Sequence, residues 1–284
     1  TEIELGVDVI PHFSKDTTDR NRTSPFAFTG NKFEFRMLGS SLSIAGPNIV
    51  LNTIVADELE YFADKLEKAE DFTATLPELI KDTIQKHTRV LFIGNGYDEA
   101  WVVEAEKRGL LNLKSTADAL PHFVDAKNLA LFAKHKVFSE AEQRSRCELL
   151  LENYCKIITI EAETMVEMIR KDIVPASYTY LKRLTETGIA TQKLCPGADC
   201  GGITEIVEEI CALTSSLQAK NAALEKTLAK VKAAEGSEAD HAKEFQALVL
   251  PAMEDARAVA DSIEERIGEK YWPYPTYGEL LFNV

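Results

Sequence analysis

The fold of this chain is decided by residues 203–232, whose sequence is ITEIVEEICALTSSLQAKNAALEKTLAKVK. Apolar side chains recur in it at alternating steps of three and four residues, which place them along one seam of a helix. At a rise of about 1.5 Å per residue, the stretch predicts a helix roughly 45 Å long. The predicted seam consists of Ile206, Ile210, Leu213, Leu217, Leu224 and Val231.

A second long helix with the same apolar period follows after Glu235, Gly236 and Ser237. Ser237 and Asp240 have the spacing of an N-terminal cap, and Pro251 predicts a kink because its ring clashes with the preceding turn. A connection this short predicts that the two helices lie antiparallel, and we expect them to pack within the chain rather than as a dimeric coiled coil. The second seam consists of Ala242, Phe245, Val249, Met253, Ala256, Ala260, Ile263 and Ile267.

The chain from Pro47 onward is predicted to be mostly helical. Pro47 suits a first helical turn. Ser139 and Glu142 match a capping box that opens a further long helix, and we expect Pro175 to close that helix. Shorter helices are predicted over residues 77–87, 97–108 and 121–134.

Three other segments have distinct patterns. Residues 89–93, RVLFI, predict a short buried strand before a turn at Gly94–Gly96. Residues 271–277, YWPYPTY, are too aromatic to stay in water, so we expect this tail to dock onto the protein. Cys195 and Cys200 lie in a glycine-rich loop, where a metal site is a weak alternative because no histidine is near them in sequence.

The start of the chain predicts β-structure instead. Residues 3–10 alternate β-branched and polar side chains, and residues 32–37, KFEFRM, alternate apolar and charged ones. In a strand, Phe33 and Phe35 would face one side and the charged residues the other. The charged residues are Lys32, Glu34 and Arg36.

The composition is that of a protein with a substantial core and an acidic surface. Of 284 residues 45% are hydrophobic, and 46 acidic against 32 basic side chains give a formal charge of −14. A surface this negative disfavours binding to nucleic acid or to anionic membranes. The first residues do not resemble a signal peptide, and no apolar run is long enough to span a bilayer. Five cysteines without framework spacing favour a reducing cytoplasm.

The charged strand and the loop before it carry the residue types of an anion and metal site. Arginines such as Arg22 and Arg36 suit a bidentate grip on phosphate or carboxylate, and a carboxylate such as Glu34 is a ligand that Mg²⁺ prefers. The alternative is a solvated strand face with surface ion pairs. Phenylalanines on both sides of the charges favour a partly buried strand over that alternative.

The loop and strand together, residues 19–36, read DRNRTSPFAFTGNKFEFR and resemble the signature of type III glutamine synthetases. The resemblance continues along the whole chain. It includes GSS at residues 39–41, PNIVLNTIVA at 47–56, GY at 96–97, EAEKRG at 104–109 and WPYPTYG at 272–278.

The resemblance implies an enzyme that joins ammonia to glutamate through γ-glutamyl phosphate, with ATP and Mg²⁺ or Mn²⁺ as cofactors. By match to the family's motifs, Arg22 and Lys32 would contact phosphate, Glu34 would bind metal, and Arg36 would hold the substrate. Position 27 departs from the pattern, because it is Ala27 where the family has another arginine.

The resemblance also implies an α+β fold that is predominantly α-helical. Residues 1–172 would be the C-terminal part of the catalytic domain, a remnant of its antiparallel sheet with covering helices. Residues 173–284 would be a helical domain with a long antiparallel hairpin or bundle. The parent would be a cytoplasmic homo-oligomeric ring, a dodecamer of stacked hexamers, with no nucleic acid and no membrane as partner.

The family's other metal ligands do not occur in this sequence, so we expect the chain alone to be inactive. Two alternatives stay open. One is a non-catalytic helical module for assembly or regulation, and the other is an unrelated coiled-coil scaffold.

Overall fold

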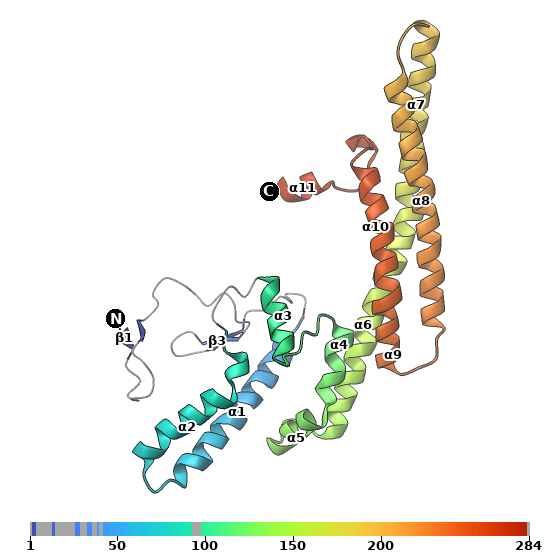
Figure 1. Cartoon of the computed structure of the whole chain (residues 1–284). Coiled ribbons are helices and arrows are strands. Elements are labelled where there is room, and N and C mark those ends of the chain that lie inside the picture. Colours follow the sequence, from blue (N-terminus) through green and yellow to red (C-terminus); the bar gives the residue numbers. More distant parts are fainter. Residues whose placement is uncertain are drawn as a thin grey trace. The chain divides into compact units, whose positions relative to one another are not determined.

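A computed structural model describes residues 39, 42–92, 98–276 and 278–282, together with the backbone of Tyr277 and of four short strands near the start (Figure 1). The described residues are predominantly helical, as predicted. They form two compact units: residues 1–114 with 126–140, and residues 115–125 with 141–284. Among the described helices, none has both the length and the apolar content needed to cross a bilayer.

The strands form two separate antiparallel pairs. β1 (Glu2–Ile3) pairs with β2 (Phe13–Ser14), and β3 (Phe26–Phe28) pairs with β4 (Phe33–Phe35). The strand predicted over residues 32–37 is therefore confirmed at its three central positions. The strand predicted over residues 3–10 is described at Ile3, and its remaining positions lie outside the described residues.

The described residues of the first unit form four helices and one 3₁₀ turn. Asp71 begins the second helix, because its Oδ1 accepts hydrogen bonds from the backbone N–H groups of Thr73 at 2.9 Å and Ala74 at 3.2 Å. This helix also contains Pro77, at which the sequence had predicted its start. The elements are α1 (Ala45–Glu67), α2 (Phe72–Lys86), η1 (Thr88–Val90), α3 (Glu99–Lys107) and α5 (Ala126–Lys134).

The buried strand predicted at residues 89–93 is wrong for the part that is described. Residues 88–90 form the 3₁₀ turn η1, and the side chains of Val90 and Leu91 are 52% and 55% exposed. An apolar run forms a buried strand only where a neighbouring strand takes up its backbone groups, and no strand is described beside this one.

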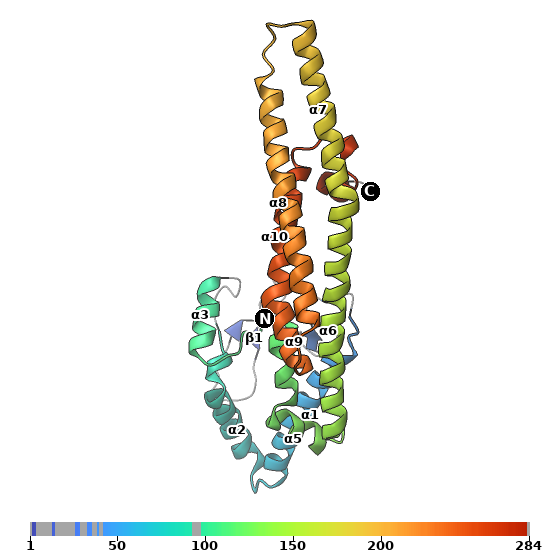
Figure 2. The same cartoon turned by 90° about the vertical axis from the view of Figure 1, so that its right-hand side faces the viewer.

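The second unit is built from three antiparallel helical rods (Figures 1 and 2). The central one, α8 (Gly201–Lys232), packs against both of the others, which confirms the predicted intramolecular packing of the long helices. The Ser237–Asp240 capping box is also present. The first rod is α6 (Glu140–Met168), η3 (Ile169–Ile173) and α7 (Val174–Leu194), and the third is α9 (Glu238–Glu244), η4 (Phe245–Val249) and α10 (Leu250–Glu264). Two short elements, α4 (Thr116–Ala119) and η2 (Leu120–Val124), complete this part of the unit.

Pro175 does not close its helix, so that prediction is wrong. The helix continues because η3 is a π turn, in which the Val174 N–H donates to the Ile169 carbonyl five residues earlier. A proline cannot donate to the α-helical ladder, and its ring clashes with the carbonyl four residues before it. One wider turn just before the proline relieves both conflicts. The third rod repeats this arrangement, since its π turn η4 ends two residues before Pro251.

The predicted division between residues 172 and 173 falls inside η3, within one uninterrupted helical path. Along the chain, the two compact units change over at residues 114–115, 125–126 and 140–141. The division of the sequence into the end of a catalytic domain and a helical extension is a separate matter, and it stays a prediction.

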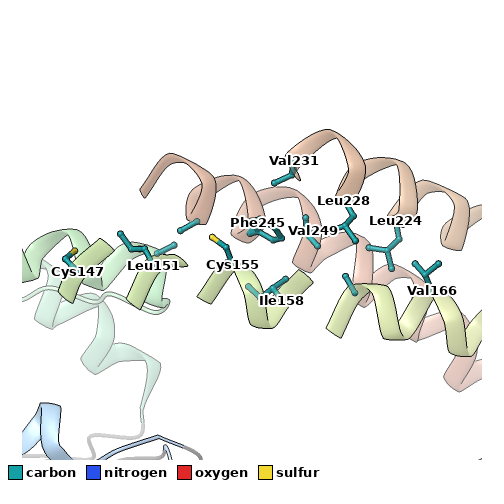
Figure 3. Close-up of a cluster of buried hydrophobic side chains, with 13 residues drawn as sticks. Cys147, Leu151, Cys155, Ile158, Val166, Leu224, Leu228, Val231, Phe245 and Val249 are labelled. Carbon is teal, nitrogen blue, oxygen red and sulfur yellow. The ribbon is translucent and has the colours of Figure 1, made fainter. Parts of the chain in front are cut away.

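The core of the second unit lies along α8 in two clusters. In the first, the face of α6 from Cys147 to Val166 packs against α8 and η4 (Figure 3). In the second, η3 and the start of α7 pack against Leu217 and α10, and the aromatic tail docks here as predicted. The buried seam of α8 consists of Ile210, Thr214, Leu217, Asn221, Leu224, Leu228 and Val231.

The buried seam contains two polar residues, Thr214 and Asn221, that were not part of the predicted seam. Thr214 donates from its hydroxyl to the Ile210 carbonyl at 2.7 Å, which satisfies it within the helix. The Asn221 side chain is 6% exposed, and its Nδ2 donates to the Val166 carbonyl at 3.4 Å while its Oδ1 has no partner. A buried asparagine at a seam position lowers stability but disfavours other registers of the helices.

We predict that Asn221→Val raises the free energy of unfolding of the second unit by about 1 kcal/mol, because the desolvated Oδ1 is removed. Leu224→Asn, one step along the same seam, is the matched control and should lower it by roughly 3 kcal/mol. Urea titration followed by Trp272 fluorescence measures both. A loss of stability of more than 1 kcal/mol in Asn221→Val would contradict the assignment of Asn221 as an unsatisfied core residue.

Candidate functional site

The site predicted from the sequence is centred on strand β4. Arg22, Lys32 and Arg36 lie outside the described residues, and Glu34 is described through its backbone alone. The sequence predictions for these four residues are therefore not tested by the structure.

The register of β3 and β4 nevertheless adds one fact about Glu34. Its position lies directly opposite Ala27, between the pairs Phe26–Phe35 and Phe28–Phe33. Directly opposed positions are nearest neighbours across an antiparallel pair. The position that departs from the glutamine synthetase pattern is thus the cross-strand neighbour of the predicted metal ligand.

A cluster of charged side chains joins α5 to α1 in the first unit. Asp57 and Glu60 lie three residues apart on one face of α1. The Lys134 Nζ lies 2.6 Å from the Asp57 Oδ1 and 2.8 Å from the Glu60 Oε2. The His135 Nε2 lies 2.9 Å from the Asp57 Oδ1 and 3.8 Å from the Glu60 Oε2.

This cluster has the residue types of a metal site, but its two carboxylates are already paired with a lysine. The ligand atoms of Asp57, Glu60 and His135 lie within 4.8 Å of one another, and one histidine with two carboxylates suits a divalent transition metal. The Lys134 ammonium, however, bridges both carboxylates. Its hydrogen bond lowers the pKa of Asp57, with His135 as the second cause. We therefore interpret the cluster as an ion-pair network between two helices.

Sequence reasoning missed this network because its members are far apart in the chain. Asp57 and His135 are separated by 78 positions, and His135 has no possible metal ligand three or four residues away in the sequence. Acidic residues three apart on a helix are common on protein surfaces. The sequence therefore offered no signal for this cluster.

The second unit has several grooves, including two that lie along α6. One, of about 620 Å³, lies between α6 and α8 and is crossed by the ion pairs Arg170–Glu225 at 2.6 Å and Lys232–Glu163 at 2.7 Å. The other, of about 530 Å³, lies between α6, α10 and the C-terminal segment. Its walls are mainly apolar, which suits packing of apolar groups rather than acid–base or phosphoryl chemistry.

The cysteine loop is described in full. Cys195 is exposed and Cys200 is buried, and both are free thiols. The Cys200 Sγ lies 3.9 Å from the Gly188 carbonyl oxygen. The group of possible metal ligands found among the described residues is the one at Asp57, and it does not include this loop.

Comparison with known proteins finds similarity to glutamine synthetases. Residues 75–193 match the family model of the glutamine synthetase C-terminal domain. The chain is 38% identical, over 99% of its length, to the type-3 glutamine synthetase of Dictyostelium discoideum. It is 41% identical over 96% of its length to a glutamine synthetase of Butyrivibrio fibrisolvens, and 33% identical over its full length to one of Bacteroides fragilis (strain YCH46).

The chain spans about two fifths of the length of these relatives, 39% for the first two and 40% for the third. The family-model match covers α2 to α7, so it includes parts of both compact units.

We predict that the ion-pair network makes the first unit more stable at neutral pH than in acid. The folded-state pKa of Asp57 lies below its ordinary value of 3.8. Its stabilising contribution is therefore present above about pH 4 and is lost as the pH falls through the folded-state pKa. Asp57→Asn should thus lower the thermal midpoint at pH 6, and the difference from the parent should shrink as the pH falls below about 4.

Glu58→Gln is the matched control, since it removes one exposed carboxylate from the next position of α1. Circular dichroism between pH 6 and pH 2 gives the midpoints. A difference between Asp57→Asn and the parent that stays constant over this range would contradict the proposed pairing.

Proposed function

We propose, from the premise that the chain corresponds to a C-terminal portion of the type III glutamine synthetases, that its parent protein is an ATP-dependent glutamate–ammonia ligase. The observation that carries this proposal is the similarity over 96–100% of the chain to three proteins named glutamine synthetase. It includes the strand that contains Glu34. The reaction would phosphorylate the glutamate side chain with ATP, after which ammonia displaces phosphate.

The roles of this chain's own residues follow from the charges that such a reaction develops. Negative charge spreads over the transferring phosphoryl oxygens, and fixed positive groups stabilise it. Arg22 and Lys32 would supply those groups. Arg36 would hold the substrate carboxylate, for which a guanidinium has two parallel donors.

The predicted metal site fits this chain only in part. A bound Mg²⁺ or Mn²⁺ would draw charge from the phosphoryl oxygens. Glu34 offers one hard oxygen ligand, and its cross-strand neighbour Ala27 offers no ligand atom. A site for divalent ions needs several oxygen ligands, so the others must come from the part of the parent that this chain does not include. We propose for this reason that the chain alone does not make glutamine.

The fold supports a placement for this site within the parent. We propose that the β3–β4 pair is the end of the catalytic antiparallel sheet, that residues 1–172 belong to the catalytic domain, and that residues 173–284 form a helical extension. The parent would be a cytoplasmic ring of identical subunits, a dodecamer of stacked hexamers as in the family.

A second candidate function is that of a non-catalytic helical module for assembly or regulation. The observation that favours it is the second unit, whose two core clusters are buried by its own helices. This unit could act as a separate module whether or not the parent is a ligase.

The two candidates are separated by Glu34→Gln and Arg36→Ala in the full-length parent. Each should lower the rate of glutamine formation at least 100-fold, because each removes a group that acts on the reacting phosphate or carboxylate. Glu34→Gln should also raise the Mn²⁺ concentration that gives half-maximal activity. The isolated 284-residue chain should give no turnover.

Arg257→Ala, in the second unit, is the control and should keep parental activity. Size-exclusion chromatography must show that all variants keep the parental oligomer. Activity within twofold of the parent in both strand variants would reject the catalytic role of this strand.

A further inference from the structure

Helix α1 of the first unit (Figure 1) has an apolar face that its contacts within the chain do not bury. Five apolar side chains recur in it at steps of three and four residues, so they share one face of the helix. Leu59 is 64% exposed, and the other four are half-buried. We call this face the α1 stripe, and it consists of Leu51, Val55, Leu59, Phe62 and Leu66.

The opposite face of α1 is polar, and it makes the contacts to α5. Thr53, Asp57 and Glu60 share this second face, which lies about half a turn from the α1 stripe. Thr53 is the buried side chain of the helix, and its hydroxyl donates to the Ile49 carbonyl at 2.7 Å. Asp57 and Glu60 are bridged by the Lys134 ammonium of α5 at 2.6 Å and 2.8 Å. Helix α1 therefore turns its polar face toward α5 and its apolar face away from it.

The second unit has the reverse arrangement, because its long helices turn their apolar seams inward. Both core clusters found among the described residues belong to it. In the first unit, by contrast, even the residues just before α1 leave apolar surface open, since Leu42 and Ile44 are 70% and 59% exposed. Adjoining exposed apolar side chains of this kind mark a surface that contacts another part of a protein.

The partner that fits this face is the part of the parent that this chain does not include. The chain spans about two fifths of the length of its relatives, so the parent has further chain to place against it. Strand β4 belongs to the same compact unit as α1, and its Glu34 needs further oxygen ligands to complete a metal site. The part of the parent that supplies those ligands must therefore contact the unit that contains the α1 stripe.

We propose that the α1 stripe is the surface on which the missing part of the parent docks, and that the first unit reaches its full stability only when this part covers the stripe. The second unit has its own core clusters and should be equally stable with or without that part. The inference rests on the proposed function because that supplies the longer parent, but it does not depend on ligase activity.

Amide hydrogen exchange, compared between the 284-residue chain and the full-length parent, tests the proposal. Exchange over residues 45–67 should be about 100-fold slower or more in the parent, because docking buries the stripe and makes opening of α1 less favourable. Exchange in α8 should agree within about threefold between the two proteins. Equal exchange of α1 in both proteins would overturn the proposal, and so would a slowing that is as large in α8 as in α1.

Leu59→Glu locates the docking surface, with Ile189→Glu as its matched control. Both leucine and isoleucine are 64% exposed in this chain, and Ile189 lies on α7 of the second unit. In the parent, Leu59→Glu should speed exchange in α1 about tenfold or more, because it places a charge in an apolar interface. In the 284-residue chain it should leave exchange in α1 unchanged, because Leu59 is already exposed there. Ile189→Glu should leave exchange in α1 unchanged in both proteins.

Other occupants of the stripe give different results. If Leu59→Glu speeds exchange equally in both proteins, the stripe belongs to the chain's own core and the proposal fails. It also fails if Leu59→Glu dissociates a dimer of the 284-residue chain in sedimentation velocity, or the oligomer of the parent in size-exclusion chromatography, since the occupant is then a second copy. Failure of the ligase proposal is detected separately, as parental activity in Glu34→Gln and Arg36→Ala, and does not alter these exchange rates.

Discussion

The second unit depends on the burial of one seam of α8. This helix supplies residues to both core clusters, Leu217 to one and Leu224, Leu228 and Val231 to the other. Burying a leucine or valine side chain fully stabilises a fold by about 2 kcal/mol, so the seam contributes packing energy to both clusters. The first and third rods each hold their position by contact with it.

The two prolines show how this packing decides the backbone. Pro175 and Pro251 each lie in a rod whose apolar face continues on both sides of the proline. Ending the rod there would expose part of a core cluster, whereas a single π turn keeps the face buried and removes the steric conflict. The turn at η3 then has a further use, because it places Asp172 where the Tyr274 hydroxyl can reach it. One π turn thus removes the local clash at the proline and keeps the tertiary packing of the rod.

Much of the helical fold was predictable because its signals are local. The heptad spacing predicted α8 and the rod after it, and Ser237 with Asp240 predicted the start of that rod. The errors arose where distant partners decide the outcome. Asn221 looks like an interruption of the seam, yet it is buried because Val166 offers it a carbonyl. The candidate site was predictable only through the motif around Glu34, since a motif identifies residue types but not the ligands that other parts of a protein contribute.

Hydrogen exchange measured peptide by peptide on the whole chain tests most directly whether α8 organises the second unit. The account predicts that amides of residues 210–231 exchange most slowly of all described segments, with η3 and η4 slower than residues 268–282, because the seam opens only when the whole unit unfolds. Faster exchange in α8 than in the outer rods, or equal exchange in α8 and in residues 268–282, would contradict it.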